Sequence, residues 1–329
     1  MKKVLAITGY GVKIASSGNR FVIKSKDNKN EIVADDISEI ILYGRSLDIT
    51  TNAIMLAIKN SIPIFFSTKF GKPYSMIMPI FTSGTVLSRR EQYLAINDGR
   101  GLELAKAFVY GKIKNQERLL RIRANDLLKS DREKSMKVRV YADEIRELAK
   151  KVDNIGNKTE LLELEAMVAK NYYWQGFATL IPEGLEFRSR EHKGSKDPIN
   201  SLLNYGYGFL LTRVINAIIL AGLDPYAGFL HSDRPGRPSL ALDLIEEFRQ
   251  PIVDHTILKI LRLKAIRFDN IIDNDRLSRD SISILLKYLK ERIEEKKGLH
   301  ALESHILEQA RNISRFLRGE IHSYKPFML

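Results

Sequence analysis

The residues of this sequence whose settings point to chemistry are a set of acidic side chains and one histidine. The 329-residue chain contains no cysteine. Thiolate nucleophiles, disulfides and cysteine-based zinc sites are therefore excluded. No Gly-x-Ser-x-Gly elbow, His-Glu-x-x-His pair or Walker sequence occurs either. The remaining nucleophiles are hydroxyl, amine and carboxylate side chains, or a water bound to a metal ion.

Glu165 is the first candidate. Helical spacing places it on one face with Val168, Ala169 and Tyr172. A carboxylate above small and aromatic neighbours points into packed protein, where an unpaired charge is costly. The residue four positions further on is alanine rather than a base, which argues against an ion pair on the helix surface. Glu163 has no such apolar context and is expected to be solvated.

His231 is the second candidate, at the end of an apolar run in the Gly- and Pro-rich stretch 222–238. A lone histidine is more often a hydrogen-bonded core or loop residue than a metal ligand, but a position just before an acidic helix favours a ligand. The other histidines show no paired ligand spacing and are expected to be surface residues or phosphate contacts. They are His192, His255, His300, His305 and His322.

Asp243 and Glu246 lie three residues apart in the segment 239–251, so both could face one site. Glu247 is expected to be solvated. Four apolar residues form the core stripe of this segment: Leu240, Leu244, Ile245 and Phe248. Together, Glu165, His231 and Glu246 would supply mixed oxygen and nitrogen ligands that suit Mn²⁺ and can hold Mg²⁺. Asp243 is a further candidate ligand.

The elements that position these residues fall into two regions, so the predicted fold class is α+β. Residues 1–85 predict a small β-rich N-terminal domain, in which runs at 21–24 and 31–33 flank a turn cluster and indicate a hairpin. Residues 86–329 predict a larger all-α C-terminal domain that carries the catalytic site. Further strands are predicted at 39–43, 62–66 and 75–78, and a helix at 51–58.

Helix boundaries in the second region are predicted from cap residues. Asn157 with Glu160 resembles a capping box that opens a helix through residue 180. Asp197 pairs an N-cap with proline at the first helical position, which predicts a helix to about residue 220. Ser239 is expected to cap a helix that Pro251 ends or kinks. Other helices are predicted at 101–127, 281–297 and 300–318.

The charge of the chain favours a polyanionic partner. It has 53 basic and 40 acidic residues, a net charge of +13, and phosphate neutralisation by basic residues drives association with nucleic acid. A basic solvated surface is the alternative. No stretch reads as a secretory signal or approaches the roughly 20 apolar residues of a membrane span, so we expect no membrane and a cytoplasmic location.

Five blocks in order resemble the catalytic subunit of CRISPR adaptation, the family of CRISPR-associated protein one. Each block alone has low specificity, but their order along the chain is distinctive. Residues 51–66 are similar to the N-domain signature, and the Glu-Ala-x-x-Ala-x-x-Tyr-Tyr run at 165–173 to the first catalytic helix. The remaining blocks are Asp-Pro-x-Asn-x-x-Leu-Asn-Tyr-Gly-Tyr at 197–207, the histidine motif at 222–231 and the acidic motif at 239–249.

The resemblance implies that Glu165, His231 and Glu246 are catalytic metal ligands for Mg²⁺ or Mn²⁺, with Asp243 as a nearby acid. It implies a homodimer paired through the N-terminal domains, joined by a small second adaptation subunit. It also implies double-stranded and branched DNA substrates, and insertion of short spacers into a CRISPR array by 3′-OH attack, or hydrolysis when water attacks. Two departures are Ala166 and Glu163, where family members often have glycine; both changes favour helix.

Two alternatives stay open from the sequence. A mobile-element integrase or a junction-specific nuclease could use the same site. A non-catalytic DNA-binding scaffold, which belongs to a different class, would tolerate replacement of Glu165 and Glu246. A set of buried carboxylates without a role would cost stability, which counts against the scaffold.

Overall fold

The computed structural model describes residues 3–26, 28–68, 73–77, 85–191, 197–298 and 300–329. It divides into two compact units, Met1–Ser83 and Gly84–Leu329. The strands longer than two residues lie in the first unit and the long helices in the second, so the predicted mixed fold with strands first and helices after is confirmed.

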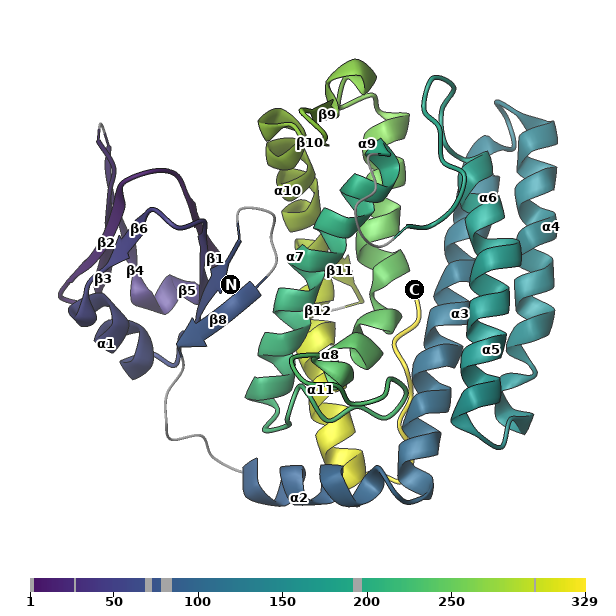
Figure 1. Cartoon of the computed structure of the whole chain (residues 1–329), viewed down its shortest axis with the longest axis horizontal. Coiled ribbons are helices and arrows are strands. Elements are labelled where there is room, and N and C mark those ends of the chain that lie inside the picture. The colour runs from purple at the N-terminus through teal and green to yellow at the C-terminus, as the bar shows by residue number, and fades with distance from the viewer. Residues whose placement is uncertain (1–2, 27, 69–72, 78–84, 192–196, 299) are drawn as a thin grey trace. The chain divides into compact units, whose positions relative to one another are not determined.

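The first unit contains two four-stranded sheets around one core (Figure 1). One sheet has the order β1-β5-β7-β8, parallel except for the β7–β8 pair, and the other the order β4-β3-β2-β6. The elements are β1 (Lys3–Thr8), β2 (Val12–Ser17), β3 (Arg20–Lys24), β4 (Lys29–Val33), β5 (Ile37–Tyr43), β6 (Leu47–Ile49), α1 (Thr51–Lys59), β7 (Ile64–Ser67) and β8 (Pro73–Ile77).

The predicted hairpin is the antiparallel β3–β4 pair, in which Phe21 lies opposite Ile32. The predicted helix is α1, and Thr50 caps it by accepting a hydrogen bond from the backbone N–H of Ala53. Fully buried residues from both sheets and from α1 share one core: Ile14, Phe21, Ile40, Ile64, Ala53 and Ala57. The sheets therefore stabilise each other by burying apolar faces.

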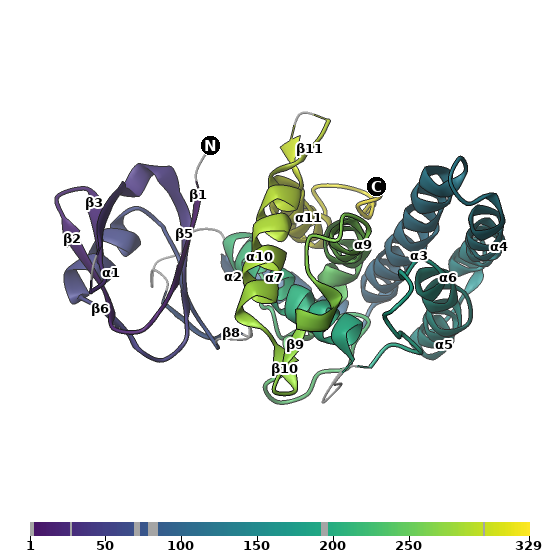
Figure 2. The same ribbon diagram turned by 90° about the horizontal axis from the view of Figure 1, so that it is seen from above.

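In the second unit, α3 lies between a group formed by α4, α5 and α6 and a group that includes α9, α10 and α11 (Figure 2). α3 packs on α4 and α5, and also contacts the segment that follows α8. The helices are α2 (Thr85–Ala95), α3 (Gly99–Leu127), α4 (Arg132–Ala149), α5 (Lys158–Val168), α6 (Trp174–Thr179), α7 (Pro198–Leu220), α8 (Ser239–Leu244), α9 (His255–Arg262), α10 (Arg279–Glu294) and α11 (Leu302–Leu317).

The second unit was predicted to be all-α, but it also contains two short antiparallel pairs of strands. They are β9 (Ile272–Asp273) with β10 (Arg276–Leu277), and β11 (Lys296–Lys297) with β12 (His300–Ala301). The β9–β10 turn is formed by Asn274 and Asp275, both with positive φ. Short polar side chains tolerate this conformation, and two such residues make the turn that joins a tight hairpin.

α7 is the most apolar long helix among the described residues and begins where predicted, with Asp197 accepting hydrogen bonds from the backbone N–H groups of Ile199 and Asn200. By length and composition it could cross a membrane, so the expectation that no stretch approaches such a span is wrong. Of the apolar 18-residue stretch of α7, 72% is buried inside the helical unit, where α7 packs on α11. The apolar composition of α7 is therefore that of a core helix.

Two predicted helices are interrupted near the candidate site: the one expected to run from Asn157 through residue 180, and the one expected to run from Ser239 to Pro251, which ends earlier, at Leu244. α5 passes into α6 through a π-helical turn, Ala169–Tyr173, and α8 passes into α9 through a 3₁₀ turn, Ile245–Glu247, and a π-helical turn, Arg249–Asp254. Pro251 lies in the last of these and cannot donate a backbone hydrogen bond. Such π turns occur often at functional sites.

Ser239 does not cap α8, contrary to the prediction. The cap position is Pro238, and the Ser239 hydroxyl donates instead to the carbonyl oxygen of Ser232 at 3.1 Å. The side chain thereby joins the start of α8 to the loop that carries His231.

Candidate active site

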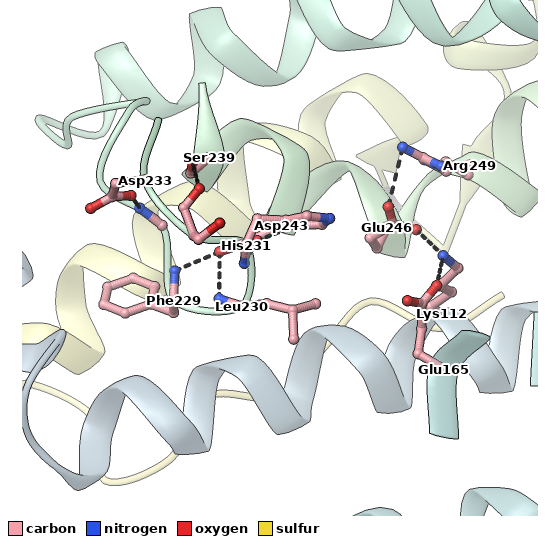
Figure 3. A network of polar contacts seen from close by, with 12 residues as sticks. Lys112, Glu165, Phe229, Leu230, His231, Asp233, Ser239, Asp243, Glu246 and Arg249 are labelled. Atoms are coloured by element: carbon pink, nitrogen blue, oxygen red, sulfur yellow. Dashed lines mark hydrogen bonds and ion pairs between the residues drawn. The ribbon is translucent and has the colours of Figure 1, made fainter. Parts of the chain in front are cut away.

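Glu165 and Glu246 meet at the ammonium group of Lys112 (Figure 3). Glu165 projects from α5, Glu246 from the 3₁₀ turn after α8, and Lys112 from α3. Lys112 Nζ bonds Glu165 Oε1 and lies 2.7 Å from Glu246 Oε2. The tertiary structure thus brings together two carboxylates that lie about 80 residues apart in the sequence.

A second cation reinforces this group. Arg249 Nη2 lies 3.2 Å from Glu246 Oε1. Burial alone would raise the pKa of Glu246, but the charges of Arg249 and Lys112 outweigh it and hold the pKa below its ordinary value. Burial would lower the pKa of Lys112, but Glu165 and Glu246 outweigh it and raise that pKa. Glu246, Lys112 and Arg249 are therefore all charged at neutral pH.

His231 is held by Asp243. Its Nδ1 lies 2.7 Å from Asp243 Oδ1, and Asp243 also accepts hydrogen bonds from the backbone N–H groups of Phe229, Leu230 and His231. Since Nδ1 is engaged, Nε2 is the nitrogen that could bind a metal ion or a phosphate. Asp243 is fully buried and both its oxygens are occupied, so its geometry suits an orienting role better than a ligand role.

A pocket of about 250 Å³ lies beside the carboxylates. Its basic wall comes from Lys112, Arg190 and Arg249, and its other lining residues are Gln116, Glu165, Ala166, Ala169, Trp174, Tyr207 and Gln250. Arg190 donates to the side-chain oxygens of Asn200 at 2.9 Å and Asn204 at 2.6 Å. Fixed guanidinium groups around a cavity favour an anionic ligand such as a phosphate.

One wall of the pocket is supported by a buried carboxyl group. The hydroxyls of Tyr173 and Tyr207 each donate to Asp254 at 2.5 Å, and the guanidinium groups of Arg190 and Arg249 lie over the Tyr207 ring. Burial raises the pKa of Asp254 to about 6, although the two hydroxyls lower it. The two π-helical turns are thus linked, since Tyr173 ends one and Asp254 ends the other.

The four predicted site residues form two adjacent groups rather than one. Lys112 joins Glu165 to Glu246, and Asp243 holds His231, which lies close enough to Glu246 to interact with it electrostatically. Among the described residues, no three His, Asp or Glu side chains form a ready metal cluster.

The donor set nevertheless fits a divalent cation. Two carboxylates already converge on one positive charge, and an imidazole with a fixed tautomer lies near one of them. Mixed carboxylate and imidazole ligands suit Mn²⁺ and are compatible with Mg²⁺.

Two expectations about neighbouring residues are wrong. Glu247 is fully buried rather than solvated, because its carboxylate accepts hydrogen bonds from the Tyr324 hydroxyl, the Gln309 amide and the backbone N–H of Phe327. His255 is largely buried against α3 rather than on the surface. Burial, followed by nearby arginine and lysine charges, lowers its pKa to about 2. His192 lies outside the described residues, whereas Glu163 is exposed as predicted.

Sequence reasoning missed Lys112, Arg190 and Arg249 as site residues. Lys112 carried a signal, because it falls in the apolar stripe of α3 between the buried Val109 and Ile113. Arg190 belongs to the basic cluster at 188–193, for which the sequence leaves a DNA contact and a solvated loop both open. Its position is fixed by its contacts with Asn200 and Asn204 of α7. Arg249 follows Glu246 by three residues, a spacing that fits an ion pair on one helical face.

Comparisons with known proteins agree with this architecture. The family model for the CRISPR associated protein Cas1 matches residues 5–291. A CRISPR-associated endonuclease Cas1 from Archaeoglobus fulgidus is 33% identical over 98% of this chain and 99% of its own. The chain belongs to the Cas1 family of CRISPR-associated proteins.

Two solved structures share the fold. A casposase bound to its integration product has a TM-score of 0.82 at 24% identity, covering 99% of this chain and 93% of the other. A Cas6-RT-Cas1–Cas2 complex matches with a TM-score of 0.80 at 20% identity over 99% of this chain and 36% of the other. At these identities the likeness concerns the fold.

Proposed function

We propose that this chain is a CRISPR spacer integrase that also acts as a DNA endonuclease. The 3′-OH of a short DNA duplex would attack a phosphodiester bond of the CRISPR array, and water would replace it in hydrolysis. The observation that carries the proposal is the convergence of Glu165 and Glu246 on one cation beside an arginine-lined pocket. Membership of a family whose relatives are CRISPR-associated endonucleases supports it.

Glu165, His231 and Glu246 would hold a Mg²⁺ or Mn²⁺ ion. Such an ion would supply the positive charge that polarises the scissile phosphate and stabilises the attacking and leaving oxygens. Asp243 would hold the His231 imidazole in the tautomer that presents Nε2, through the 2.7 Å contact with Nδ1.

The arginines of the pocket would bind the phosphate of the target strand. Arg249 is placed by Glu246 and by the Tyr207 ring, and Arg190 by Asn200 and Asn204. Guanidinium groups held in this way make directed hydrogen bonds to phosphate oxygens. The chain would thereby orient the scissile bond with side chains that are already in place before DNA binds.

The partners that we propose are double-stranded and branched DNA, a second copy of this chain paired through the N-terminal units, and a Cas2-type subunit. The net charge of +13 supports a DNA partner. The fold shared with a casposase bound to its integration product also supports a DNA partner, and the fold shared with a Cas6-RT-Cas1–Cas2 complex supports a Cas2-type subunit. Pairing with a second copy of this chain stays a prediction from the family resemblance. A cytoplasmic location stays a prediction.

The test is a strand-transfer and nuclease assay on duplex and branched DNA with Mn²⁺, Mg²⁺ or EDTA. We expect metal-dependent products from the wild type and none from Glu165→Ala or His231→Ala. The matched control is Glu163→Ala, because Glu163 lies on the same helix but is exposed. Activity retained in folded Glu165→Ala protein would contradict the assignment.

Fold likeness to a casposase also favours a second candidate, a mobile-element integrase that uses the same site. Target choice separates the two. A CRISPR spacer integrase should insert at the leader end of a repeat array in preference to unrelated DNA, whereas a mobile-element enzyme should not distinguish the array.

A further inference from the structure

Lys112 occupies the place between the carboxylates that a metal ion would need. It lies in the apolar stripe of α3, next to Ile113, and its ammonium group is buried against Glu165 and Glu246. A buried ammonium is costly unless it is paired. The lysine therefore depends on both carboxylates, and without it they would repel each other.

The charges of this group already balance. Glu165 and Glu246 carry two negative charges, and Lys112 and Arg249 carry two positive ones. A divalent cation would gain little net attraction from a neutral group, and it would compete with Lys112 for Glu246 Oε2, which lies 2.7 Å from Nζ. Lys112 in its present position therefore repels a metal ion at that oxygen and competes with it for the carboxylate.

The neighbouring pocket offers the ammonium group another place. Lys112, Gln116 and Gln250 all line it, and Gln116 follows Lys112 by one helical turn on α3. The side-chain oxygens of Gln116 and Gln250 are buried and accept no hydrogen bond from the described part of the chain. A lysine has a flexible four-carbon stem, so its ammonium could serve both acceptors.

We propose that Lys112 is a tethered cation that holds Glu165 and Glu246 together without metal and withdraws toward Gln116 and Gln250 when a divalent cation binds. This inference rests on the proposed function, because it assumes a metal on those carboxylates. Withdrawal moves one positive charge into the pocket, where the arginines would bind a DNA phosphate. Metal binding and DNA binding would then strengthen each other by the same factor.

The experiment measures Mn²⁺ affinity by titration calorimetry on the full chain at pH 8, first without DNA. We expect Lys112→Met to bind Mn²⁺ roughly tenfold or more tightly than the wild type, because the competing charge is gone. The matched control is Lys114→Met on the same helix, whose ion pair is with Glu117, and it should bind Mn²⁺ as the wild type does. Glu246→Gln should lose binding.

A second titration follows DNA affinity with and without a metal. Ca²⁺, a divalent oxygen-seeking ion, is added to avoid turnover, and we expect it to tighten DNA binding to the wild type more than to Lys112→Met. Equal or weaker Mn²⁺ affinity in Lys112→Met, with normal binding by the wild type, would overturn the role of Lys112. No Mn²⁺ binding by the wild type would instead remove the metal site of the proposed function.

If Lys112→Met does not fold, crystals of the wild type with and without Mn²⁺ decide the question. The inference requires Lys112 Nζ to leave Glu246 Oε2 in the loaded crystal. An ammonium group that keeps both carboxylate contacts beside a bound Mn²⁺ would contradict it.

Discussion

The Nδ1 atom of His231 lies 2.7 Å from Oδ1 of Asp243, and the same carboxylate accepts hydrogen bonds from three consecutive backbone N–H groups. One buried side chain therefore sets both the turn of the loop and the orientation of the imidazole. His231 lies in an irregular segment, but these hydrogen bonds fix both its backbone and the orientation of its ring.

Asp243→Asn should damage both functions of that side chain. An amide nitrogen in place of one carboxylate oxygen would face N–H donors and leave them unpaired. We expect the free energy of unfolding to fall by about 2–4 kcal/mol, with weaker Mn²⁺ binding. Urea unfolding checks this, with Asp233→Asn as the control, because Asp233 accepts one long hydrogen bond of 3.3 Å from Gly228. A variant as stable as the wild type would contradict the structural role of Asp243.

Gly228→Ala should disturb the same loop by steric overlap. A methyl group at this position would lie 2.6 Å from Ser239 Cβ, 2.8 Å from the Ser239 carbonyl carbon and 3.0 Å from Asp243 Oδ2. Since the backbone of α8 cannot yield easily, we expect a loss of about 1–3 kcal/mol in unfolding free energy. Thermal unfolding measures the loss. Gly156→Ala, where the methyl group meets open space, should not show it.

Tyr173→Phe and Tyr207→Phe should each weaken the wall of the pocket. Each variant removes a hydroxyl that donates to Asp254 at 2.5 Å. The pKa of Asp254, which burial raises to about 6, should rise further, because one donor to the charged form is lost.

We expect each change to cost about 1–3 kcal/mol in unfolding free energy at pH 8, and less at pH 5, where Asp254 is protonated. Urea unfolding at both pH values tests this, with the half-exposed Tyr226→Phe as control. The double variant should cost a different amount from the sum of the single ones, because both hydroxyls serve one carboxyl group. Strict additivity would argue against the shared contact.

Glu247→Gln should change how stability depends on pH. Burial raises the pKa of Glu247 to about 7 from an ordinary 4.5, so the folded state binds a proton that the unfolded state has released between these values. The stabilisation is complete below about pH 4.5 and is lost as pH rises through about 7.

Glutamine resembles the protonated form and should not show this loss. Relative to the wild type, the variant should gain about 2–3 kcal/mol in unfolding free energy between pH 5 and pH 8, measured by urea unfolding. Exposed Glu163→Gln is the control. A constant difference across this range would show that Glu247 does not titrate with a raised pKa.

Local structure was largely readable from the sequence. The hairpin β3–β4, the helix α1 and the start of α7 at Asp197 follow from turn residues, helical spacing, cap residues and proline, whose effects act within a few residues. The core stripe of Leu240, Leu244, Ile245 and Phe248 follows from periodicity, and all four are buried.

Breaks inside helices were only partly readable, because proline predicted an end or a kink at Pro251 but not the helical forms that the chain takes there. The π-helical turn after α5 and the 3₁₀ and π turns around Pro251 depend on how the segments pack on α3 and α7, not on the local residues alone. Local propensity differs little between these helical forms, so tertiary contacts decide among them.

The sequence by itself determined which residue types were available for the site, and periodicity together with family resemblance singled out Glu165, His231 and Glu246. Only the tertiary structure decided their neighbours. Lys112 joins the two glutamates, and Asp243 is used to hold His231. These relationships link segments many residues apart, and whether a buried charge is paired depends on the partner that folding brings to it.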